Sequence, residues 1–597
     1  MEKHRSRPSL YTLAGSTGRW KRLGEIAALT VENNESRGSP RKIKITLRGM
    51  ELLRNPMLNK GTAFSAEERA VFGLDGLLPV RTKNLHQQAT RIYEQLQAQP
   101  DDLQKYVLLS ALLNRNVHLF YRVLIDHLEE LMPIVYTPTV GTAVQRFSRV
   151  FQGGGGLWIT PDMKGRMAQV VRNAVGHRDI RLLVVTDNES ILGLGDQGAG
   201  GMAISVGKLA LYTAAAGINP VQALPVSLDF GTDNEEMLAD DQYLGWPARR
   251  LRGAEYMALV DEFVDAVSTV LPKALVQWED FRKDNALTIL DRFVDRVPSF
   301  NDDIQGTGAV VVAGLNSALR IKHERLADQR IVIFGAGAAG LGVARQIKTQ
   351  LAEEGLGDAE ELLARVAVLD RHGLLVDDGR IMDPYKRELA WTPNVAARFG
   401  LDDTSARMLL DVVRKYRPTM LIGVSGVGGA FTEEVVREMA AHVEQPVIFP
   451  SSNPSANSEA RPADLFKWTD CRCLVAAGSP FGDVECGGRR YKVGQGNNVF
   501  IFPGLGLGAL AARARKVTEG MTNAASKALA QQVTDDECEA GMLFPAVSRL
   551  RAVSYAIAVA VARQALEDGV ADIRAEDIEA QVRATMWDPE YPEYEPA

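Results

Sequence analysis

Apolar runs that end at a polar residue recur along the middle of the chain and predict buried strands. R-L-L-V-V-T-D ends at Asp187, A-L-P-V-S-L-D ends at Asp229, and A-L-V-Q-W leads directly to Glu279 and Asp280. A helix-like apolar segment, M-A-I-S-V-G-K-L-A-L-Y-T-A-A-A-G, lies between the first two runs. Strands that alternate with helices are typical of parallel sheets covered by helices. This part of the chain therefore predicts an α/β domain.

Before these strands, apolar residues at helical spacing predict a helical N-terminal domain. Leucine, valine and isoleucine follow this spacing from Leu108 to Leu131, and Ser65 with Glu68 forms a capping-box pattern at an earlier helix start. The segment closes with M-P-I-V-Y-T-P-T-V-G, which places Tyr136 before a Thr-Pro turn. Tyr136 is either a packed tyrosine with its hydroxyl satisfied or a functional group.

A dinucleotide-binding fingerprint follows the strand-like run R-I-V-I-F. In G-A-G-A-A-G, Gly335 permits a tight turn, Gly337 lets a pyrophosphate approach, and Gly340 lets the next helix pack on the strand. The following strand, R-V-A-V-L-D, ends at Asp370, which is placed to bind the adenosine ribose. Because the separation exceeds the usual ~20 residues, we expect an extended helix or loop between them.

A second match to the same fingerprint lies earlier, in G-L-G-D-Q-G from Gly193 to Gly198. It also follows a strand and has an acidic strand end downstream at Asp229. However, T-D-N-E-S-I-L separates it from its strand, whereas the later strand runs straight into its first glycine. We therefore assign the dinucleotide to the later copy. Two further strands, the second followed by Asn453, would end at the same edge of that sheet, where ligands usually bind.

Composition limits the classes of partner and compartment. A chain of 597 residues is too long for one core, and 46% hydrophobic with 24% charged residues is typical of soluble globular proteins. A net charge of -7 argues against nucleic acid or membrane partners, and no apolar run reaches the roughly 18 residues that span a bilayer. Four cysteines give no reason to expect disulfides and favour a reducing compartment, and we predict the cytoplasm rather than the mitochondrial matrix. The basic N-terminus is interpreted as a flexible tail.

Two acidic pairs are the candidate chemistry of the α/β region. Asp302 and Asp303 lie in the otherwise uncharged segment S-F-N-D-D-I-Q-G-T-G, and Glu279 and Asp280 follow an apolar run. Carboxylates from two segments suit a hard divalent cation such as Mg²⁺ or Mn²⁺, but solvated loop carboxylates are an equal alternative. Lys208 is the one lysine in an apolar helix, so it either reaches water or is tuned for proton transfer.

Several segments, in order from about Leu58 to beyond Leu510, together resemble the malic enzymes. They are L-N-K-G-T-A-F, M-P-I-V-Y-T-P-T-V-G, I-L-G-L-G-D-Q-G, V-G-K-L, W-E-D-F, F-N-D-D-I-Q-G-T, G-A-G-x-x-G, S-N-P and G-Q-G-N-N. The resemblance implies oxidative decarboxylation of L-malate to pyruvate and CO₂ with NAD or NADP and a divalent metal. It also implies a soluble homodimer or homotetramer.

The resemblance implies a role for each candidate carboxylate. Glu279, Asp280 and Asp303 would bind Mg²⁺ or Mn²⁺, whereas Asp302 would pair with Lys208. The metal would polarise the ketone so that loss of CO₂ gives a stabilised enolate. Lys208 would take the proton of the malate C2 hydroxyl as a base poised near neutrality.

Further contacts follow from the same resemblance. Tyr136 would protonate C3 to release pyruvate, and Asn453 and Asn498 would contact the substrate, with Asn453 also at the cofactor. Ser190 stands where most of the family has an arginine that grips a malate carboxylate, so a bidentate clamp is missing. Weak malate affinity is one expected consequence. Malolactic enzymes, which keep NAD bound and release lactate, share this feature and are the second interpretation.

Cofactor choice and two other functional classes complete the hypotheses. Asp370 favours the ribose hydroxyls of NAD, whereas Arg371 and Lys386 would suit the 2′-phosphate of NADP, so we predict NAD with NADP as the alternative. A sensor that kept the fold without the chemistry is disfavoured because Lys208, Tyr136 and the carboxylates are all present. An amino-acid dehydrogenase would not explain the two acidic pairs.

The sequence thus predicts an α/β fold with a Rossmann-type doubly wound dinucleotide-binding domain, a second parallel α/β substrate domain and a helical N-terminal domain. The expected boundaries are a flexible basic tail and lead-in at 1–55, the helical domain at 56–150, the substrate domain at 151–301 with 498–565, the NAD-binding domain at 302–497, and a C-terminal helix and tail at 566–597.

Overall fold

The computed structural model describes residues 42–153, 155–574 and 576–597; most of the predicted basic tail lies outside these ranges. One parallel sheet in the centre of the chain has the strand order β2-β4-β3-β5-β6. Its strands are β2 (Leu157–Ile159), β3 (Leu182–Thr186), β4 (Ala223–Leu228), β5 (Leu275–Trp278) and β6 (Ser299–Asn301). The three central strands are buried along their whole length, as expected for a parallel sheet with helices on both faces.

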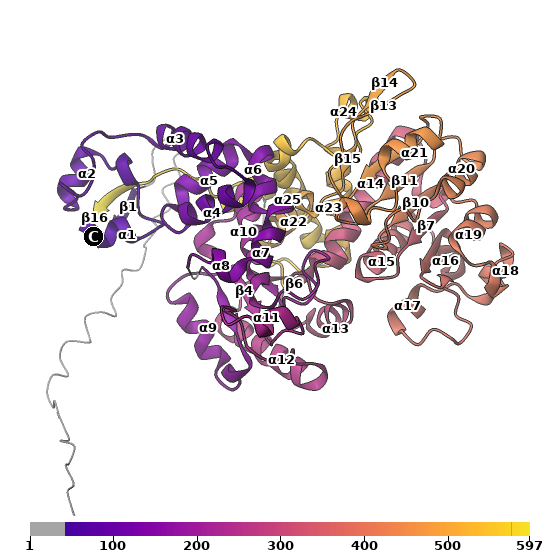
Figure 1. The fold of residues 1–597 in the computed structure, drawn as a ribbon, viewed down its shortest axis with the longest axis horizontal. Coiled ribbons are helices and arrows are strands. Elements are labelled where there is room, and N and C mark those ends of the chain that lie inside the picture. The colour runs from indigo at the N-terminus through magenta and orange to yellow at the C-terminus, as the bar shows by residue number, and fades with distance from the viewer. Residues whose placement is uncertain (1–41, 154, 575) are drawn as a thin grey trace, which may run out of the picture.

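Helices surround this sheet and precede it in the chain (Figure 1). Those that follow its strands are α9 (Met167–Val175), α10 (Met202–Ala216), α11 (Glu235–Ala239), α12 (Gly253–Val270) and α13 (Lys283–Phe293). The helices before it are α1 (Gly49–Arg54), α2 (Ala66–Val71), α3 (Leu85–Gln97), α4 (Asp102–Leu113), α5 (Val117–Asp126), α6 (Leu128–Val135), α7 (Thr139–Gln145) and α8 (Phe147–Val150). The predicted capping box of Ser65 and Glu68 begins α2.

A second sheet has the order β15-β12-β11-β10-β7-β8-β9, parallel except for β9. Its strands are β7 (Ile331–Phe334), β8 (Val366–Asp370), β9 (Gly373–Leu374), β10 (Met420–Gly423), β11 (Val447–Pro450), β12 (Leu474–Ala477) and β15 (Gly494–Gln495). The chain moves from β7 to β8 on one side and to β10 on the other. Ligands bind at such a switch point in doubly wound sheets.

The helices of the second sheet lie around its strands in the right-hand part of Figure 1. They are α14 (Thr307–Lys322), α15 (Ala338–Glu353), α16 (Ala359–Arg365), α17 (Pro384–Leu389), α18 (Pro393–Arg398), α19 (Leu409–Tyr416), α20 (Glu433–His442) and α21 (Pro462–Trp468). The extra helix α16 explains why Asp370 lies so far from the glycine turn in sequence.

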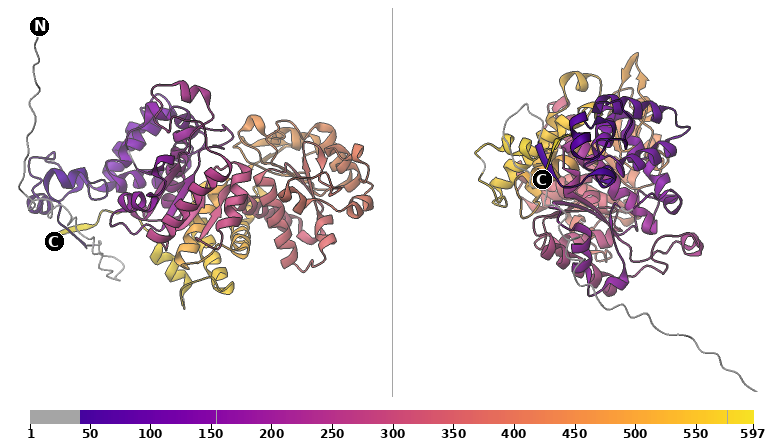
Figure 2. Two further views of the ribbon diagram at one scale, coloured as in Figure 1. Left: turned by 90° about the horizontal axis from the view of Figure 1, so that it is seen from below. Right: turned by 90° about the vertical axis from the view of Figure 1, so that its left-hand side faces the viewer.

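C-terminal helices join the two sheets. They are α22 (Phe502–Ala511), α23 (Glu519–Gln531), α24 (Asp535–Glu539), α25 (Leu550–Glu567) and α26 (Ile578–Thr585). Helix α22 packs on α10 of the first sheet, and α23 packs on α14 beside the second. These helices, drawn in yellow, lie between the two sheet regions in Figures 1 and 2. The first and second sheets therefore share one continuous core.

The end of the chain returns to its beginning. The acidic tail forms strand β16 (Glu593–Pro596), which pairs in parallel with β1 (Lys42–Ile45). Tyr594 packs there with Phe64 and Phe72 in a small separate core. The sequence predicted only a tail here, because a strand whose partner lies about 550 residues away leaves no local signal. No helix among the described residues is long and apolar enough to cross a membrane.

The cysteines differ from the expectation. Cys471 and Cys486 form a disulfide that ties the loop after α21 to the hairpin of β13 (Val484–Cys486) and β14 (Arg489–Tyr491). Cys473 is buried and forms no disulfide. The prediction without a disulfide was wrong because composition counts cysteines and does not show which of them a hairpin brings together.

Candidate active site

The two acidic pairs meet at the carboxyl ends of neighbouring strands. Glu279 and Asp280 follow β5, and Asp302 and Asp303 follow β6, which lies beside β5 in parallel. One carboxylate oxygen from each of Glu279, Asp280 and Asp303 lies within 4.8 Å of the other two. The backbone N–H of Asp280 donates to Asp303 Oδ2 at 2.9 Å. The structure thus brings together the three carboxylates expected to bind a metal.

Burial excludes the interpretation of these groups as solvated loop carboxylates. Glu279, Asp280 and Asp302 are buried, and Asp303 is half-buried. Burial, followed by repulsion between the carboxylates, raises the pKa of Glu279 to about 8 and that of Asp303 to about 6, and raises that of Asp280 as well. Oxygen ligands from three carboxylates suit Mg²⁺ or Mn²⁺. The donor set therefore fits the cation that the sequence predicted.

Lys208 projects from α10 into the same group of carboxylates. Its Nζ lies 2.5 Å from Asp302 Oδ2 and 2.9 Å from Glu279 Oε1, and the side chain is buried. It therefore does not reach water. Burial lowers the pKa of Lys208, but Asp302 and Glu279 outweigh that effect and raise the pKa well above its usual value. These two carboxylates therefore favour the protonated form of the Lys208 amine.

Asp302 has a different environment from Asp303, one residue later. The turn from Asp302 to Gly306 is a π-helical segment, η6, that points the Asp302 side chain toward Lys208 and Asn498. Asn498 Nδ2 donates to Asp302 Oδ2 at 3.0 Å and to Thr307 Oγ1 at 3.1 Å. The other oxygen, Asp302 Oδ1, is buried and has no hydrogen-bond partner among the described residues. Asp302 therefore lies where it can orient Lys208.

Tyr136 lies on the other side of Lys208. It ends α6, and its ring centroid is 5.3 Å from Lys208 Nζ. Burial raises the pKa of Tyr136 well above 10, and the positive charge of Lys208 opposes that shift. The hydroxyl consequently keeps its proton at neutral pH. Tyr136 is thus a buried acid next to the lysine, and it also packs in the hydrophobic core.

The structure also shows supporting residues that sequence reasoning missed. Gln277 Nε2 donates to Glu279 Oε2 at 2.7 Å, and the Tyr212 hydroxyl donates to Gln277. The Phe502 ring lies 4.3 Å from Lys208 Nζ and comes from a helix nearly 300 residues further along the chain. A polar Gln277 inside a buried strand was a usable signal, because it shares a face with Glu279. Phe502 carried no such signal.

The earlier glycine pattern, from Gly193 to Gly198, forms a loop of the domain that contains the first sheet. Because this domain carries the four carboxylates, we call it the metal-side domain. Arg250 is buried, donates to both carboxylate oxygens of Asp196 at 2.9 and 2.7 Å, and donates to the carbonyl of Asp187. The N–H of Leu192 donates to Asp280 Oδ2 at 3.3 Å, and that of Ser190 donates to the Asp280 carbonyl at 3.1 Å. The loop therefore positions a carboxylate, and the Ser190 side chain is exposed beside it.

The glycines of the later pattern form the turn between β7 and α15. Gly335 has φ +128°, and a Cβ there would lie 2.5 Å from the carbonyl oxygen of Val424 after β10. A Cβ at Gly340 would lie 1.8 Å from the Gly335 carbonyl, whereas a Cβ at Gly337 would meet no atom within 4 Å. The turn thus has one open side, at Gly337, where a pyrophosphate would approach.

The same helix α15 touches the carboxylate turn. A Cβ at Gly342 would lie only 2.0 Å from the carbonyl oxygen of Ile304, which follows Asp303. Only glycine allows this backbone approach. The glycine turn of the second sheet and the carboxylates of the first are therefore held next to each other.

At the far end of the nucleotide site, Asp370 ends β8 as predicted. Its Oδ2 accepts a hydrogen bond from Lys386 Nζ at 2.6 Å, and its Oδ1 accepts one from the His372 N–H at 2.7 Å. Arg371 is exposed, and its Nε lies 3.0 Å from His372 Nε2. Asp370 is thus available at a strand end but already paired with a lysine.

The two predicted asparagines lie on different domains. Asn498 is beside Asp302, whereas Asn453 follows β11 and accepts a hydrogen bond from Ser479 Oγ at 2.6 Å. A Cβ at Gly193 would lie 3.7 Å from the Asn453 carbonyl, so Asn453 borders the loop of Ser190. Nearby, Glu459 is fully buried and accepts hydrogen bonds from Ser425 and Ser452, which joins the loops after β10 and β11. Sequence reasoning missed Glu459.

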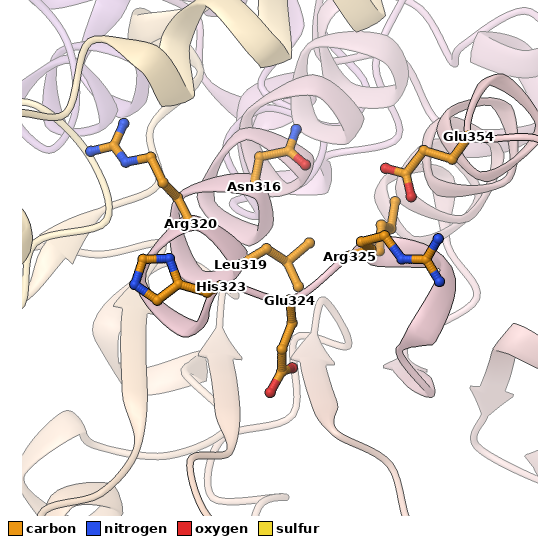
Figure 3. A pocket seen from close by; sticks show the side chains of 8 residues that line it. Asn316, Leu319, Arg320, His323, Glu324, Arg325 and Glu354 are labelled. Atoms are coloured by element: carbon orange, nitrogen blue, oxygen red, sulfur yellow. The ribbon is translucent and has the colours of Figure 1, made fainter.

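A surface hollow lies away from this site, at the end of α14 (Figure 3). Arg320, Glu324, Arg325 and Glu354 line it, and each already pairs with protein groups. The hollow therefore offers no set of free polar groups comparable to the carboxylates around Lys208.

A glycine turn on one doubly wound sheet, held against a carboxylate cluster on another, defines a dinucleotide-binding α/β protein of two linked sheets. Family models described as "Malic enzyme, N-terminal domain" and "Malic enzyme, NAD binding domain" match residues 113–294 and 304–566. NAD-dependent malic enzyme 3 of Bacillus subtilis (strain 168) is 48% identical to this chain in an alignment that covers 93% of this chain and 97% of the Bacillus subtilis sequence. The chain therefore belongs to the malic enzyme family.

Other relatives and solved structures agree. The NAD-dependent malic enzyme 1 of Vibrio vulnificus (strain YJ016) is 44% identical over 93% of this chain and 98% of its own. Crystal structures of malic enzymes from Entamoeba histolytica and Pyrococcus horikoshii superpose with TM-scores of 0.53 and 0.51, each at 23% identity. The Entamoeba histolytica superposition covers 86% of this chain and 90% of that enzyme, and the Pyrococcus horikoshii superposition covers 76% of this chain and 88% of that enzyme. At that identity they support the fold.

The raised carboxyl pKa values predict a pH-dependent cation site. A raised folded-state pKa stabilises the cation-free protein as pH falls and destabilises it as pH rises through about 6 for Asp303 and about 8 for Glu279. Mn²⁺ competes with those protons, so the increase in Tm caused by Mn²⁺ relative to EDTA should grow from pH 6 to pH 8. Differential scanning calorimetry measures it. Asp303→Asn should remove most of the increase, and an equal increase at both pH values would contradict the site.

Proposed function

We propose that this protein catalyses the oxidative decarboxylation of L-malate to pyruvate and CO₂, with NAD as hydride acceptor and Mg²⁺ or Mn²⁺ as cofactor. The observation that carries the proposal is the contact of Lys208 with Asp302 and Glu279, next to three converging carboxylates and to the helix of the glycine turn. The names of the relatives, which are NAD-dependent malic enzymes, support it.

Lys208 is the proposed general base. It accepts the proton of the malate C2 hydroxyl while the C2 hydride passes to NAD, and Asp302 holds its Nζ in place. Glu279, Asp280 and Asp303 would hold the dication, which would supply Lewis-acid chemistry to the substrate and offset part of the negative charge around Lys208.

Tyr136 is the proposed acid for the last step. Loss of CO₂ leaves an enolate whose C3 needs a proton, and the Tyr136 hydroxyl, with its raised pKa, keeps one until that point. The distance of 5.3 Å between its ring centroid and Lys208 Nζ supports an acid and a base that act on the same substrate. The proton that Lys208 gained can replace the one that Tyr136 gives.

Ser190, Asn453 and Asn498 are the proposed malate contacts. Asn498 borders Asp302, and Asn453 borders the loop of Ser190. Neither an exposed serine nor two amides provide a bidentate charged clamp. Binding of the malate dianion therefore depends more on the bound cation than it does with an arginine at position 190.

The Asp370–Lys386 pair bears on cofactor choice. A carboxylate at the end of β8 accepts ribose hydroxyls, and it repels a 2′-phosphate. Lys386 offsets part of that repulsion. NAD is accordingly the proposed cofactor, bound with Gly335, Gly337, Gly340 and Asp370, and NADP is the weaker alternative.

A homodimer or homotetramer is the proposed assembly. In the N-terminal part of the chain that contains α1 and α2, four large apolar side chains are exposed: Met50 (47%), Val71 (43%), Leu77 (43%) and Val80 (92%). Exposed apolar side chains of this kind could form an interface with a second copy of the chain.

The product of L-malate turnover tests the proposed function. Purified protein with L-malate, NAD and Mn²⁺ should form NADH, followed at 340 nm, and pyruvate, identified by NMR. Lactate without accumulation of NADH would instead indicate a malolactic enzyme, the alternative that Ser190 favours. Binding of NAD with no turnover would indicate a sensor.

Variants of Lys208 and Tyr136 separate the two proton transfers. Lys208→Ala should lower kcat about 10²- to 10⁴-fold and show the full isotope effect of malate deuterated at C2, because hydride transfer becomes limiting. Tyr136→Phe should lower kcat with a suppressed isotope effect, because protonation of C3 becomes limiting. Rapid kinetics with labelled malate measures both. Normal turnover by Tyr136→Phe would show that another group is the acid.

Restoration of the missing arginine tests the role of position 190. Ser190→Arg should lower the KM for malate roughly tenfold, because charge-assisted hydrogen bonds to a carboxylate are worth about 1.5–3 kcal/mol. Steady-state kinetics measures it, with Ser190→Gln as a control of similar length without charge. An unchanged KM for malate in Ser190→Arg would show that another cation already binds the carboxylate.

A further inference from the structure

An ion pair between the two sheets lies close to both halves of the site. Lys283, the first residue of α13, donates through Nζ to Asp383 Oδ2. Lys283 belongs to the helix that follows β5 of the first sheet, and Asp383 belongs to the N-terminal end of α17 on the second. Their side chains are 21% and 28% exposed, so water only partly screens the pair.

On the metal side, Lys283 is three residues from Asp280. The intervening turn is held by Phe281, which is buried and packs edge-on to Trp278 at 5.7 Å between ring centroids. A tightly packed turn therefore links Lys283 to Asp280.

On the side of the second sheet, two successive hydrogen bonds connect Asp383 to Asp370, the carboxylate predicted to bind the ribose. Asp383 Oδ1 caps α17 by accepting from the N–H groups of Tyr385 and Lys386 at 3.0 and 3.4 Å. In the same turn, Lys386 Nζ donates to Asp370 Oδ2 at 2.6 Å. One short helix therefore carries a group that contacts the metal-side domain and a group that contacts Asp370.

We propose that the Lys283–Asp383 ion pair is a positioning contact that couples dinucleotide binding at Asp370 to cation and malate binding at Asp280. The inference rests on the proposed function for its choice of ligands. A ribose bound at Asp370 displaces Lys386 and with it the first turn of α17. Asp383, in the same turn, transmits this displacement to α13 and to the carboxylate turn at Asp280. Because binding coupling is reciprocal, the cation favours the nucleotide by the same factor as the nucleotide favours the cation.

The chain contains a matched ion pair for comparison. Lys516 Nζ lies 2.7 Å from Asp295 Oδ1, just beyond the other end of α13, with side chains 38% and 79% exposed. It joins the segment after α13 to the segment between α22 and α23, and neither residue belongs to α17. Loss of Lys516 removes a lysine from a pair near the same helix without affecting the contact between the two sheets.

A double-mutant cycle with NADH fluorescence and Mn²⁺ titration tests the proposal without requiring turnover. Lys283→Met removes one charge, and Asp383→Asn removes the other while keeping a good helix cap. Each variant should reduce roughly fivefold the factor by which Mn²⁺ tightens NADH binding, the size expected from a partly exposed ion pair. The double variant should behave as either single variant does, and Lys283→Arg should retain the coupling.

The controls separate this inference from the proposed function. Lys516→Met should leave the coupling between Mn²⁺ and NADH unchanged, and calorimetry should show each variant folded. Coupling that is unchanged in Lys283→Met, or losses that add in the double variant, would overturn the ion pair as a coupling contact. If the wild-type protein shows the coupling but does not turn over malate, the proposed function fails and the ion pair stands.

Discussion

One buried lysine shares a small space with four carboxylates, and the imbalance of charge is the constraint on which this site depends. Lys208 neutralises only part of the charge of Glu279, Asp280, Asp302 and Asp303. Buried carboxylates that remain uncompensated take up protons or a cation. The raised pKa values of Glu279 and Asp303 express the first outcome, and a bound dication is the second. The same charge sets the protonation of Lys208.

The fold satisfies this constraint by placing chain segments rather than single residues. The carboxyl ends of β5 and β6 are adjacent because the strands are parallel neighbours, so the two acidic pairs meet without long side chains. The close approach at Gly342 then holds the carboxylate turn against α15, and Asn498 and Phe502 complete the surroundings of Lys208 from the C-terminal helices. Acid, base, carboxylates and glycine turn thus come from distant parts of the chain.

Local patterns were enough for some of these features and insufficient for others. Gly335, Gly337 and Gly340 were predictable because their spacing expresses a backbone requirement of the turn itself. Glu459 was not predictable, because it accepts hydrogen bonds from Ser425 and Ser452, which lie on two loops that only the fold of the second sheet brings together. The Lys283–Asp383 pair was likewise invisible, since exposed-looking charges near helix starts are common in any sequence. The direction of the Lys208 pKa also depended on neighbours.

The sequence by itself determined the alternation of strands and helices and the position of the dinucleotide fingerprint, because these depend on spacing along the chain, and its resemblance to the malic enzymes indicated the candidate residues. The tertiary structure decided which carboxylates are buried, that Glu279 as well as Asp302 contacts Lys208, that Arg250 holds the loop of the earlier glycine pattern, and that the tail forms β16. These depend on contacts between segments hundreds of residues apart, whose energies no local pattern contains.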